Sequence, residues 1–137
     1  MGYEIIDNSG DVGIKANGND CADAWVNAGI GMYSLITDPE KILEKKSLEI
    51  EIISDSLEGL LVNYLNELIF HFDAYYFIGR RIAISSFSEG TIRATIYGEE
   101  FDPEQHERRL LLKAATYHNI KIVMGSAMCE VEVIFDI

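Results

Sequence analysis

The chain has 137 residues, of which 11 are Lys or Arg and 23 are Asp or Glu, so its formal charge is −12. A chain of this length can bury its own hydrophobic core, and its apolar residues occur only in short runs. None approaches the roughly 20 residues that a membrane-spanning helix needs. The negative charge repels phosphate backbones. We therefore expect neither a membrane protein nor a protein that binds nucleic acid directly and stably.

The acidic surface has two open interpretations. It suits a basic protein partner or a cation, or it only maintains solubility. The N-terminal residues lack the basic segment, apolar run and cleavage site of a secretory signal, so a cytoplasmic location is expected. Cys21 and Cys129 lie far apart and outside any Cys-x-x-Cys pair, which indicates neither a zinc cage nor a disulfide framework. We expect two reduced thiols.

The N-terminal third predicts a strand pair followed by a helix. Residues 3–6 and 12–17 resemble short strands, and the stretch 7–10 between them is rich in turn-forming residues. Apolar residues then recur at helical spacing from about 21 to 36. Pro39 ends this helix, because proline cannot donate a backbone hydrogen bond and disfavours helical geometry in the residue before it.

The remainder predicts one more helix within a β-rich chain. Residues 47–54 alternate between apolar and polar, and an apolar stripe from Leu57 to Phe72 follows Asp55, which with Glu58 resembles a capping box. From Tyr76 onward, β-branched runs separated by turn residues indicate an antiparallel sheet. The predicted fold is α+β, a single domain over residues 1–137 with two amphipathic helices packed on a mainly antiparallel sheet.

Carboxylates near both ends of the chain form a candidate metal site. Alternation in the last strand places Asp136 away from the core and Ile137 on the same face as Phe135, while Asp11 precedes the first apolar residue of its own strand. If the two strands are neighbours, both aspartates and the main-chain carboxylate of Ile137 converge. Three such anions require a cation, and oxygen ligands select calcium, magnesium or manganese. The competing interpretation is that these are ordinary surface acids, since several other aspartates exist and Ca²⁺-loop spacing is absent.

Lys113 is the other residue singled out, because it interrupts an apolar run. Strand alternation places Lys113 and Tyr117 on one face and His118 on the other. A functional role and a solvent-exposed or ion-paired lysine are both compatible with the pattern. The three histidines form no recognisable catalytic triad and are interpreted as structural or exposed. The Gly29-Ile30-Gly31 segment is interpreted as a site of close helix packing. Gly98-Glu99-Glu100 is expected to end a strand before Phe101 and is interpreted as a turn with solvated acids.

Five ordered blocks of the sequence resemble the archease family. Residues 3–14 resemble the opening of this family, which usually reads Asp-His-Thr-Ala-Asp-Val. The other blocks are 28–38, 60–68, Gly98-Glu99-Glu100 with 113–118, and the terminal Phe135-Asp136-Ile137.

The resemblance implies a function that the residues alone do not reveal. Archeases activate the RNA ligase that seals tRNA exons, by promoting guanylylation of the ligase and its multiple turnover. GTP and manganese belong to the ligase, and the activator is not itself an enzyme. The resemblance further implies a metal site, usually described as a calcium site, at Asp11, Asp136 and Ile137, and a functional role for Lys113.

One departure and two alternatives stay open at this stage. Asn8, Ser9 and Gly10 stand where the family usually has His, Thr and Ala, so a role of that histidine in orienting Asp11 or touching the ligase is in doubt. The first alternative is a metal-dependent phosphoesterase, in which the ion activates water and Lys113 stabilises developing charge. The second is a general chaperone or scaffold for RNA-modifying enzymes.

Overall fold

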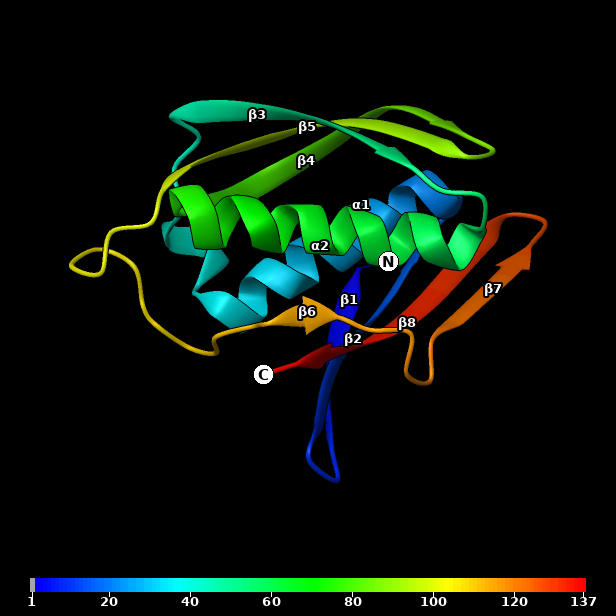
Figure 1. Ribbon diagram of the computed structural model, residues 1–137, viewed down its shortest axis with the longest axis horizontal. Helices are drawn as coiled ribbons and strands as arrows, with labels where there is room; N and C mark the ends of the chain where they lie inside the picture. The colour runs from blue at the N-terminus through cyan, green and yellow to red at the C-terminus, as the bar shows by residue number, and fades with distance from the viewer. Residues whose placement is uncertain (1) are drawn as a thin grey trace.

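The computed structural model describes residues 2–137, in which two helices lie between two antiparallel sheets (Figure 1). The helices are α1 (Cys21–Ile36) and α2 (Leu57–Tyr75), and a 3₁₀ turn, η1 (Pro39–Lys41), follows α1. Sheet A consists of β1 (Tyr3–Asn8), β2 (Asp11–Gly18), β6 (Ala114–Ala115), β7 (Lys121–Gly125) and β8 (Met128–Asp136). Its strands lie in the order β1-β2-β8-β6, and β7 also pairs with β8. Sheet B, in the order β3-β5-β4, consists of β3 (Lys46–Ile53), β4 (Phe77–Ser88) and β5 (Thr91–Glu100).

The α+β class, both helices and the antiparallel pairing are confirmed, but the strands after Tyr76 do not form one sheet. β4 and β5 join β3 in sheet B, whereas β6, β7 and β8 join β1 and β2 in sheet A. The buried residues nevertheless form one hydrophobic cluster that includes both helices and both sheets. Two sheets are possible because α1 buries side chains on more than one side. No helix within residues 2–137 has the length and apolar character needed to cross a bilayer.

The turn between β1 and β2 is a two-residue hairpin that sets the position of Asp11. Ser9 and Gly10 have φ values of 55° and 85°, as the central residues of a type I′ turn require. Asn8 and Asp11 are therefore paired across the turn, and both strands extend closer to it than the sequence pattern predicted. Asp11 is the first residue of β2.

Helix α1 depends on close packing at two glycines. A Cβ at Gly29 would lie 2.5 Å from Tyr64 Oη and 2.6 Å from Ile82 Cδ1, on the side of α2 and sheet B. A Cβ at Gly31 would lie 3.0 Å from Ile14 Cγ2, on the side of sheet A. The prediction of close packing at these glycines is confirmed, and it explains how one helix fits between two sheets.

Helix α2 and its flanking strand follow the predicted pattern with one correction. Ser56, not Asp55, caps α2, because the Ser56 side chain accepts a 3.0 Å hydrogen bond from the N–H of Gly59. On β3, the edge strand of sheet B, Ile50 and Ile52 are buried while Glu49 and Glu51 are exposed. The alternation expected for a half-buried strand is therefore confirmed.

Substituting Gly29 by alanine tests the close packing of α1. Alanine favours helix formation by about 1 kcal/mol over glycine, but the added methyl group crowds Tyr64 Oη, which donates a 2.9 Å hydrogen bond to the carbonyl of Trp25. We expect Gly29→Ala to lower the free energy of unfolding by about 1–3 kcal/mol in urea denaturation. The cost should be smaller in a Tyr64→Phe background, and strictly additive costs of the two substitutions contradict this packing.

Candidate functional site

The pairing of β2 with β8 brings Asp11 and Asp136 to the same end of sheet A. Val12 is paired with Phe135, so Asp11 and Asp136 occupy the next position along the two antiparallel strands. β6 lies on the other side of β8 at this point, with Ala114 opposite Asp136. Three segments therefore lie side by side at this end of sheet A: the start of β2, the end of β8 and residues 113–115. The neighbouring strands on which the carboxylate prediction depended are present.

Ile137 differs from its expected position. β8 ends at Asp136, and the side chain of Ile137 is 50% exposed, although strand alternation predicted that it would share the buried face with Phe135. The alternation fails because β6 pairs with β8 only as far as Asp136, so Ile137 lies beyond the ladder. The buried side chain that would have fixed the terminal carboxylate in place is therefore absent. Asp136 itself is exposed, as expected.

Lys113 lies beside the carboxylates, but not on a strand. Its N–H donates a 2.7 Å hydrogen bond to the carbonyl of Asp136, and its side chain is exposed. The prediction that Lys113, Tyr117 and His118 alternate on one strand is wrong, because β6 contains only Ala114 and Ala115. The chain turns after β6, where Thr116 bonds to the carbonyl of Ile134, and Tyr117 and His118 are both exposed.

The turn after β6 adds a histidine to this end of the sheet. His118 Nε2 lies 3.9 Å from Asp11 Oδ2, and both side chains reach solvent. The sequence analysis interpreted His118 as structural or exposed, and exposure is confirmed. Its proximity to Asp11 was missed, since only the β2–β8–β6 arrangement brings these distant residues together.

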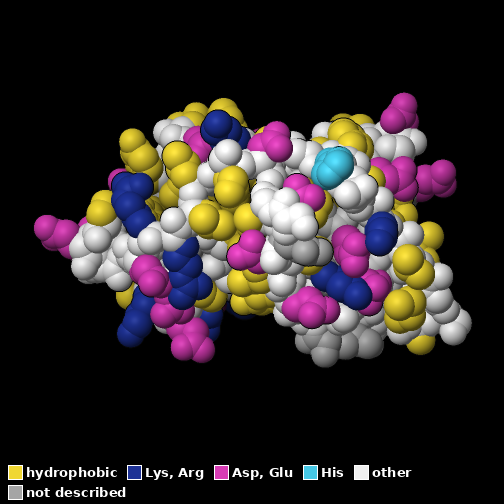
Figure 2. Space-filling view, turned by 90° about the horizontal axis from the view of Figure 1, so that it is seen from below, with side chains coloured by type: hydrophobic (Ala, Val, Ile, Leu, Met, Phe, Trp, Pro, Cys, Tyr) yellow, Lys and Arg dark blue, Asp and Glu magenta, His cyan; other side chains and the backbone are white. Residues whose placement is uncertain are grey.

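The other acidic residues on β8 are occupied by lysines. Lys15 lies 3.5 Å from Glu130 and 3.8 Å from Glu132, and Lys121 lies 3.5 Å from Glu132. Figure 2 shows the outer face of sheet A, where acidic and basic side chains are interspersed. Within residues 2–137, neither Asp11 nor Asp136 has a Lys or Arg nitrogen within 4.0 Å of its carboxylate. Unlike Glu130 and Glu132, these two aspartates are therefore not occupied by a lysine or arginine.

The two aspartate carboxylates suit a hard cation only if a third oxygen ligand joins them. No group of three or more His, Cys, Asp or Glu side chains that could bind a metal occurs in the described part of the chain. Asp11 and Asp136 supply two carboxylates, and a third oxygen donor has to come from the main chain, as the terminal carboxylate does in the predicted set. Such an all-oxygen set fits calcium or magnesium and does not fit metals that prefer thiolates.

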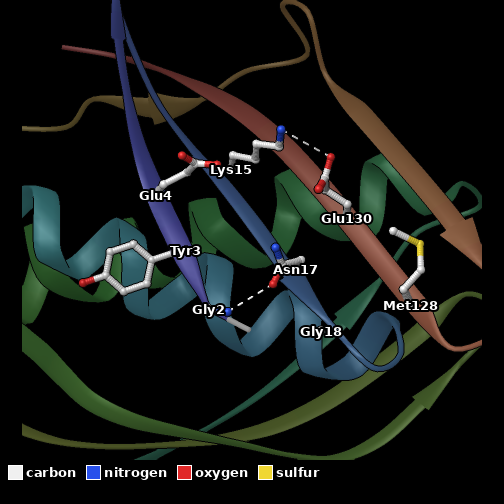
Figure 3. Close-up of a pocket in the computed structure, with 8 residues that line it drawn as sticks. All are labelled: Gly2, Tyr3, Glu4, Lys15, Asn17, Gly18, Met128 and Glu130. Carbon is white, nitrogen blue, oxygen red and sulfur yellow. Dashed lines mark hydrogen bonds and ion pairs between the residues drawn. The ribbon is translucent and has the colours of Figure 1, made fainter.

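The candidate residues lie at the surface, outside a hollow of sheet A. That hollow, of about 510 Å³, is formed by β1, β2 and β8, with Lys15 directed towards Glu130 across it (Figure 3). Neither Asp11, Lys113 nor Asp136 lines it. The aspartates and Lys113 therefore lie outside this hollow, and the side chains of Lys113 and Asp136 are exposed.

Comparison with known proteins identifies the family. The sequence model of the archease protein family matches residues 3–137. The chain belongs to the archease family. It is 32% identical over 136 residues to protein archease of Sulfolobus acidocaldarius, with 98% of each chain covered. The family resemblance inferred from the five sequence blocks is thereby confirmed.

Solved structures support the same conclusion for the fold. The solution structure of Methanobacterium thermoautotrophicum protein 1598 covers 99% of both chains with a TM-score of 0.82 and 30% sequence identity. A crystal structure from Thermotoga maritima, described as an archease and possible chaperone, covers 98% of this chain and 96% of its own. Its TM-score is 0.61 at 17% identity, which supports the fold alone.

A buried Glu–His pair in this archease was missed by the sequence analysis. Glu99 is 4% exposed, and its Oε2 lies 3.0 Å from Nε2 of His106 and accepts a 2.6 Å hydrogen bond from the N–H of Leu43. His106 Nδ1 accepts from the N–H of Asp102, so its Nε2 carries the proton donated to Glu99. The prediction that Gly98-Glu99-Glu100 ends a strand is confirmed, since β5 ends at Glu100, and Glu100 is exposed as expected. The prediction that Glu99 is a solvated acid in a turn is wrong, because Glu99 is a buried residue of the strand. No local sequence pattern indicates that Glu99 is covered by two separate loops, one containing Leu43 and the other His106.

The environment of Glu99 has opposing effects on its pKa. Burial alone raises the pKa of this carboxyl group, whereas the hydrogen bonds from Leu43 and His106 and the positive charge of Lys45 lower it, and the net pKa falls below its ordinary value of 4.5. A folded-state pKa below the unfolded value stabilises the protein above about pH 4.5, and this stabilisation is lost as the pH falls through the folded-state value.

Replacing Glu99 by glutamine tests this contribution. We expect Glu99→Gln to lower the free energy of unfolding by about 1–3 kcal/mol at neutral pH, because hydrogen bonds to a charged acceptor are lost. The variant should also lose less stability than the wild type when the pH is lowered below 4.5. Thermal denaturation at several pH values measures both effects. Glu100→Gln, at an exposed neighbouring position, is the control, and equal behaviour of the two variants contradicts the assignment.

Proposed function

We propose that this protein activates a tRNA-splicing RNA ligase by promoting guanylylation of the ligase and its multiple turnover. Asp11, Asp136 and the main-chain carboxylate of Ile137 bind a divalent cation, most simply calcium, and together with Lys113 form the activating surface. The protein is an accessory factor and not the enzyme. GTP and manganese serve the ligase.

The observation that supports this proposal most directly is the convergence of residues 11, 113 and 136 at one end of sheet A. The β2–β8 register aligns the two aspartates, and the backbone of Lys113 is bonded to that of Asp136. These residues belong to three separate blocks of the archease resemblance. Their convergence at this exposed end of sheet A fits a surface that a protein partner binds.

The oxygen groups of this edge need a cation in order to stay together. When bound, calcium supplies the positive charge that offsets the repulsion of three carboxylates, and water completes its six to eight oxygen ligands. Asp11 is held by the hairpin turn before it, and Asp136 by its pairing with Ala114 of β6 and by the hydrogen bond from the N–H of Lys113. Asp136 at the end of β8, and Ile137 after it, then have defined positions from which to contact the ligase.

The distribution of charge favours contact with the ligase protein over contact with RNA. The chain carries a formal charge of −12, and its outer sheet face mixes both signs without a basic patch (Figure 2). Phosphate binding requires clustered Lys and Arg. We infer that activation acts by stabilising the nucleotide-accepting conformation of the ligase, with a coupling free energy on the order of 1–3 kcal/mol.

Multiple-turnover sealing of broken tRNA halves tests the activator role. The assay contains the cognate ligase, GTP and manganese, and compares wild-type protein with Asp11→Asn, Asp136→Asn and Lys113→Ala. We expect wild-type protein to stimulate sealing and each variant to reduce the stimulation, by about 5- to 150-fold if the full coupling is lost.

Glu130→Gln is the matched control for this assay, because Glu130 is a carboxylate on the same strand that lies outside the site and next to Lys15. The control should stimulate sealing like the wild type. Absence of stimulation by folded wild-type protein contradicts the proposed function, and equal losses in Glu130→Gln and Asp136→Asn contradict the proposed site.

Calcium titration tests the cation site without the ligase. Binding to the folded state alone stabilises it, by about 2.7 kcal/mol at a calcium concentration one hundred times the Kd. We therefore expect calcium to raise the melting temperature of the wild type and of Glu130→Gln. Asp11→Asn, Asp136→Asn and a variant extended beyond Ile137 should respond much less. A similar calcium response in all five proteins contradicts the ligand assignment.

A general chaperone or scaffold role is the second candidate. The related Thermotoga maritima protein is described as a possible chaperone, and the exposed position of the candidate residues suits protein contact equally well. Stabilisation of unrelated enzymes against heat, without an effect on the ligase, would favour this candidate over the activator.

A further inference from the structure

The two cysteines of the chain, which the sequence analysis treated as separate thiols, lie in direct contact. Cys21 is the first residue of α1 and Cys129 is the second residue of β8, 108 positions later. Their Sγ atoms are 2.9 Å apart, and both cysteines are free. The two free thiols are as expected, but their proximity was not predicted because it depends on the contact between the start of α1 and β8.

The short distance between the sulfur atoms favours bond formation. A disulfide bond is about 2.0 Å long, so closure requires the sulfur atoms to approach by less than about 1 Å from their present separation. Cys21 is the first residue of its helix, and Cys129 is anchored by pairing with both Gly18 and Met124. Both thiols are therefore held in position by regular secondary structure before any oxidation takes place.

The two thiols differ in their access to solvent. Cys129 is buried, whereas Cys21 is partly exposed. Burial, followed by the hydrogen bond with Cys21 and the negative charges of Cys21 and Asp20, raises the pKa of Cys129 to about 12. Cys129 therefore stays protonated at neutral pH and is shielded from reagents. Reaction with a dissolved oxidant begins at Cys21.

We propose that Cys21 and Cys129 form a reversible intramolecular disulfide when the protein meets a low-molecular-weight disulfide such as oxidised glutathione. The Cys21 thiolate attacks one sulfur of glutathione disulfide, forms a mixed disulfide and releases one glutathione. Cys129 then loses its proton to solvent, attacks Sγ of Cys21 and releases the second glutathione. The two cysteine thiols lose two protons and two electrons, and glutathione disulfide gains them as two thiols.

The disulfide joins the start of α1 to the strand that carries Asp136 at its other end. It closes a loop that contains most of the chain, and a long closed loop restricts the unfolded state strongly. The oxidised protein should therefore be more resistant to heat than the reduced protein. This gain in thermal stability is independent of the ligase activity.

Incubation of the folded, full-length protein in glutathione buffers of increasing oxidised fraction tests the proposal. Intact-mass measurement after acid quenching should show a loss of about 2 Da as both thiols disappear together, without a glutathione adduct at completion. The melting temperature should rise by about 5–15 °C and return on addition of dithiothreitol. Closure should be faster at higher pH, because more of the Cys129 thiol is then ionised.

Cys21→Ser and Cys129→Ala provide the matched controls. Cys129→Ala should retain a glutathione adduct on Cys21, because the second thiol that displaces it is missing. Cys21→Ser should resist modification in the folded state, since its remaining thiol is buried. The proposal is overturned if the wild type stops at the mixed disulfide, if the bond forms only in denatured protein, or if oxidation yields covalent dimers instead of the internal bond.

Discussion

The insertion of α1 between two sheets is the constraint on which the rest of the structure depends. The helix contacts β2 on one side and β4 on the other, so neither side tolerates large side chains at the points of closest approach. Gly29 permits contact with Tyr64 and Ile82, and Gly31 permits contact with Ile14. Because interiors are packed as densely as organic crystals, these contacts fix the separation of the two sheets.

Strand β8 connects the two regions of chemical interest, the pair of thiols and the pair of aspartates. It pairs with β2 along one edge, and with β7 and β6 along the other. Cys129 near its start contacts the beginning of α1, while Asp136 at its end follows the residue paired with Val12 and bonds to the backbone of Lys113. A change in the register of this single strand would move Cys129 away from Cys21 and Asp136 away from Asp11 at the same time.

Local periodicity was sufficient to predict α1, the half-buried strand β3 and the orientation of Asp136, and turn-forming residues indicated the bend between β1 and β2. It was not sufficient where the conformation depends on partners distant in sequence. Lys113 was assigned to a strand because its neighbours are apolar, yet that segment pairs with β8 for only two residues. Glu99 resembled a solvated acid until Leu43 and His106, from two other loops, were seen to bond with it. The approach of Asp11 to Asp136 was predictable only on the condition that their strands are neighbours.

The charged outer side of β3 bears on how these molecules behave at high concentration. As the edge of sheet B, β3 presents unpaired backbone groups that could pair with the same edge of a second molecule. Such pairing would bring exposed Glu49 of one molecule close to Glu49 of the other, and the repulsion opposes continuous sheet growth, whereas Glu51 is already paired with Arg93. Acidic solutions or high salt weaken this repulsion, so the edge that is inert under neutral, dilute conditions becomes a route to aggregation.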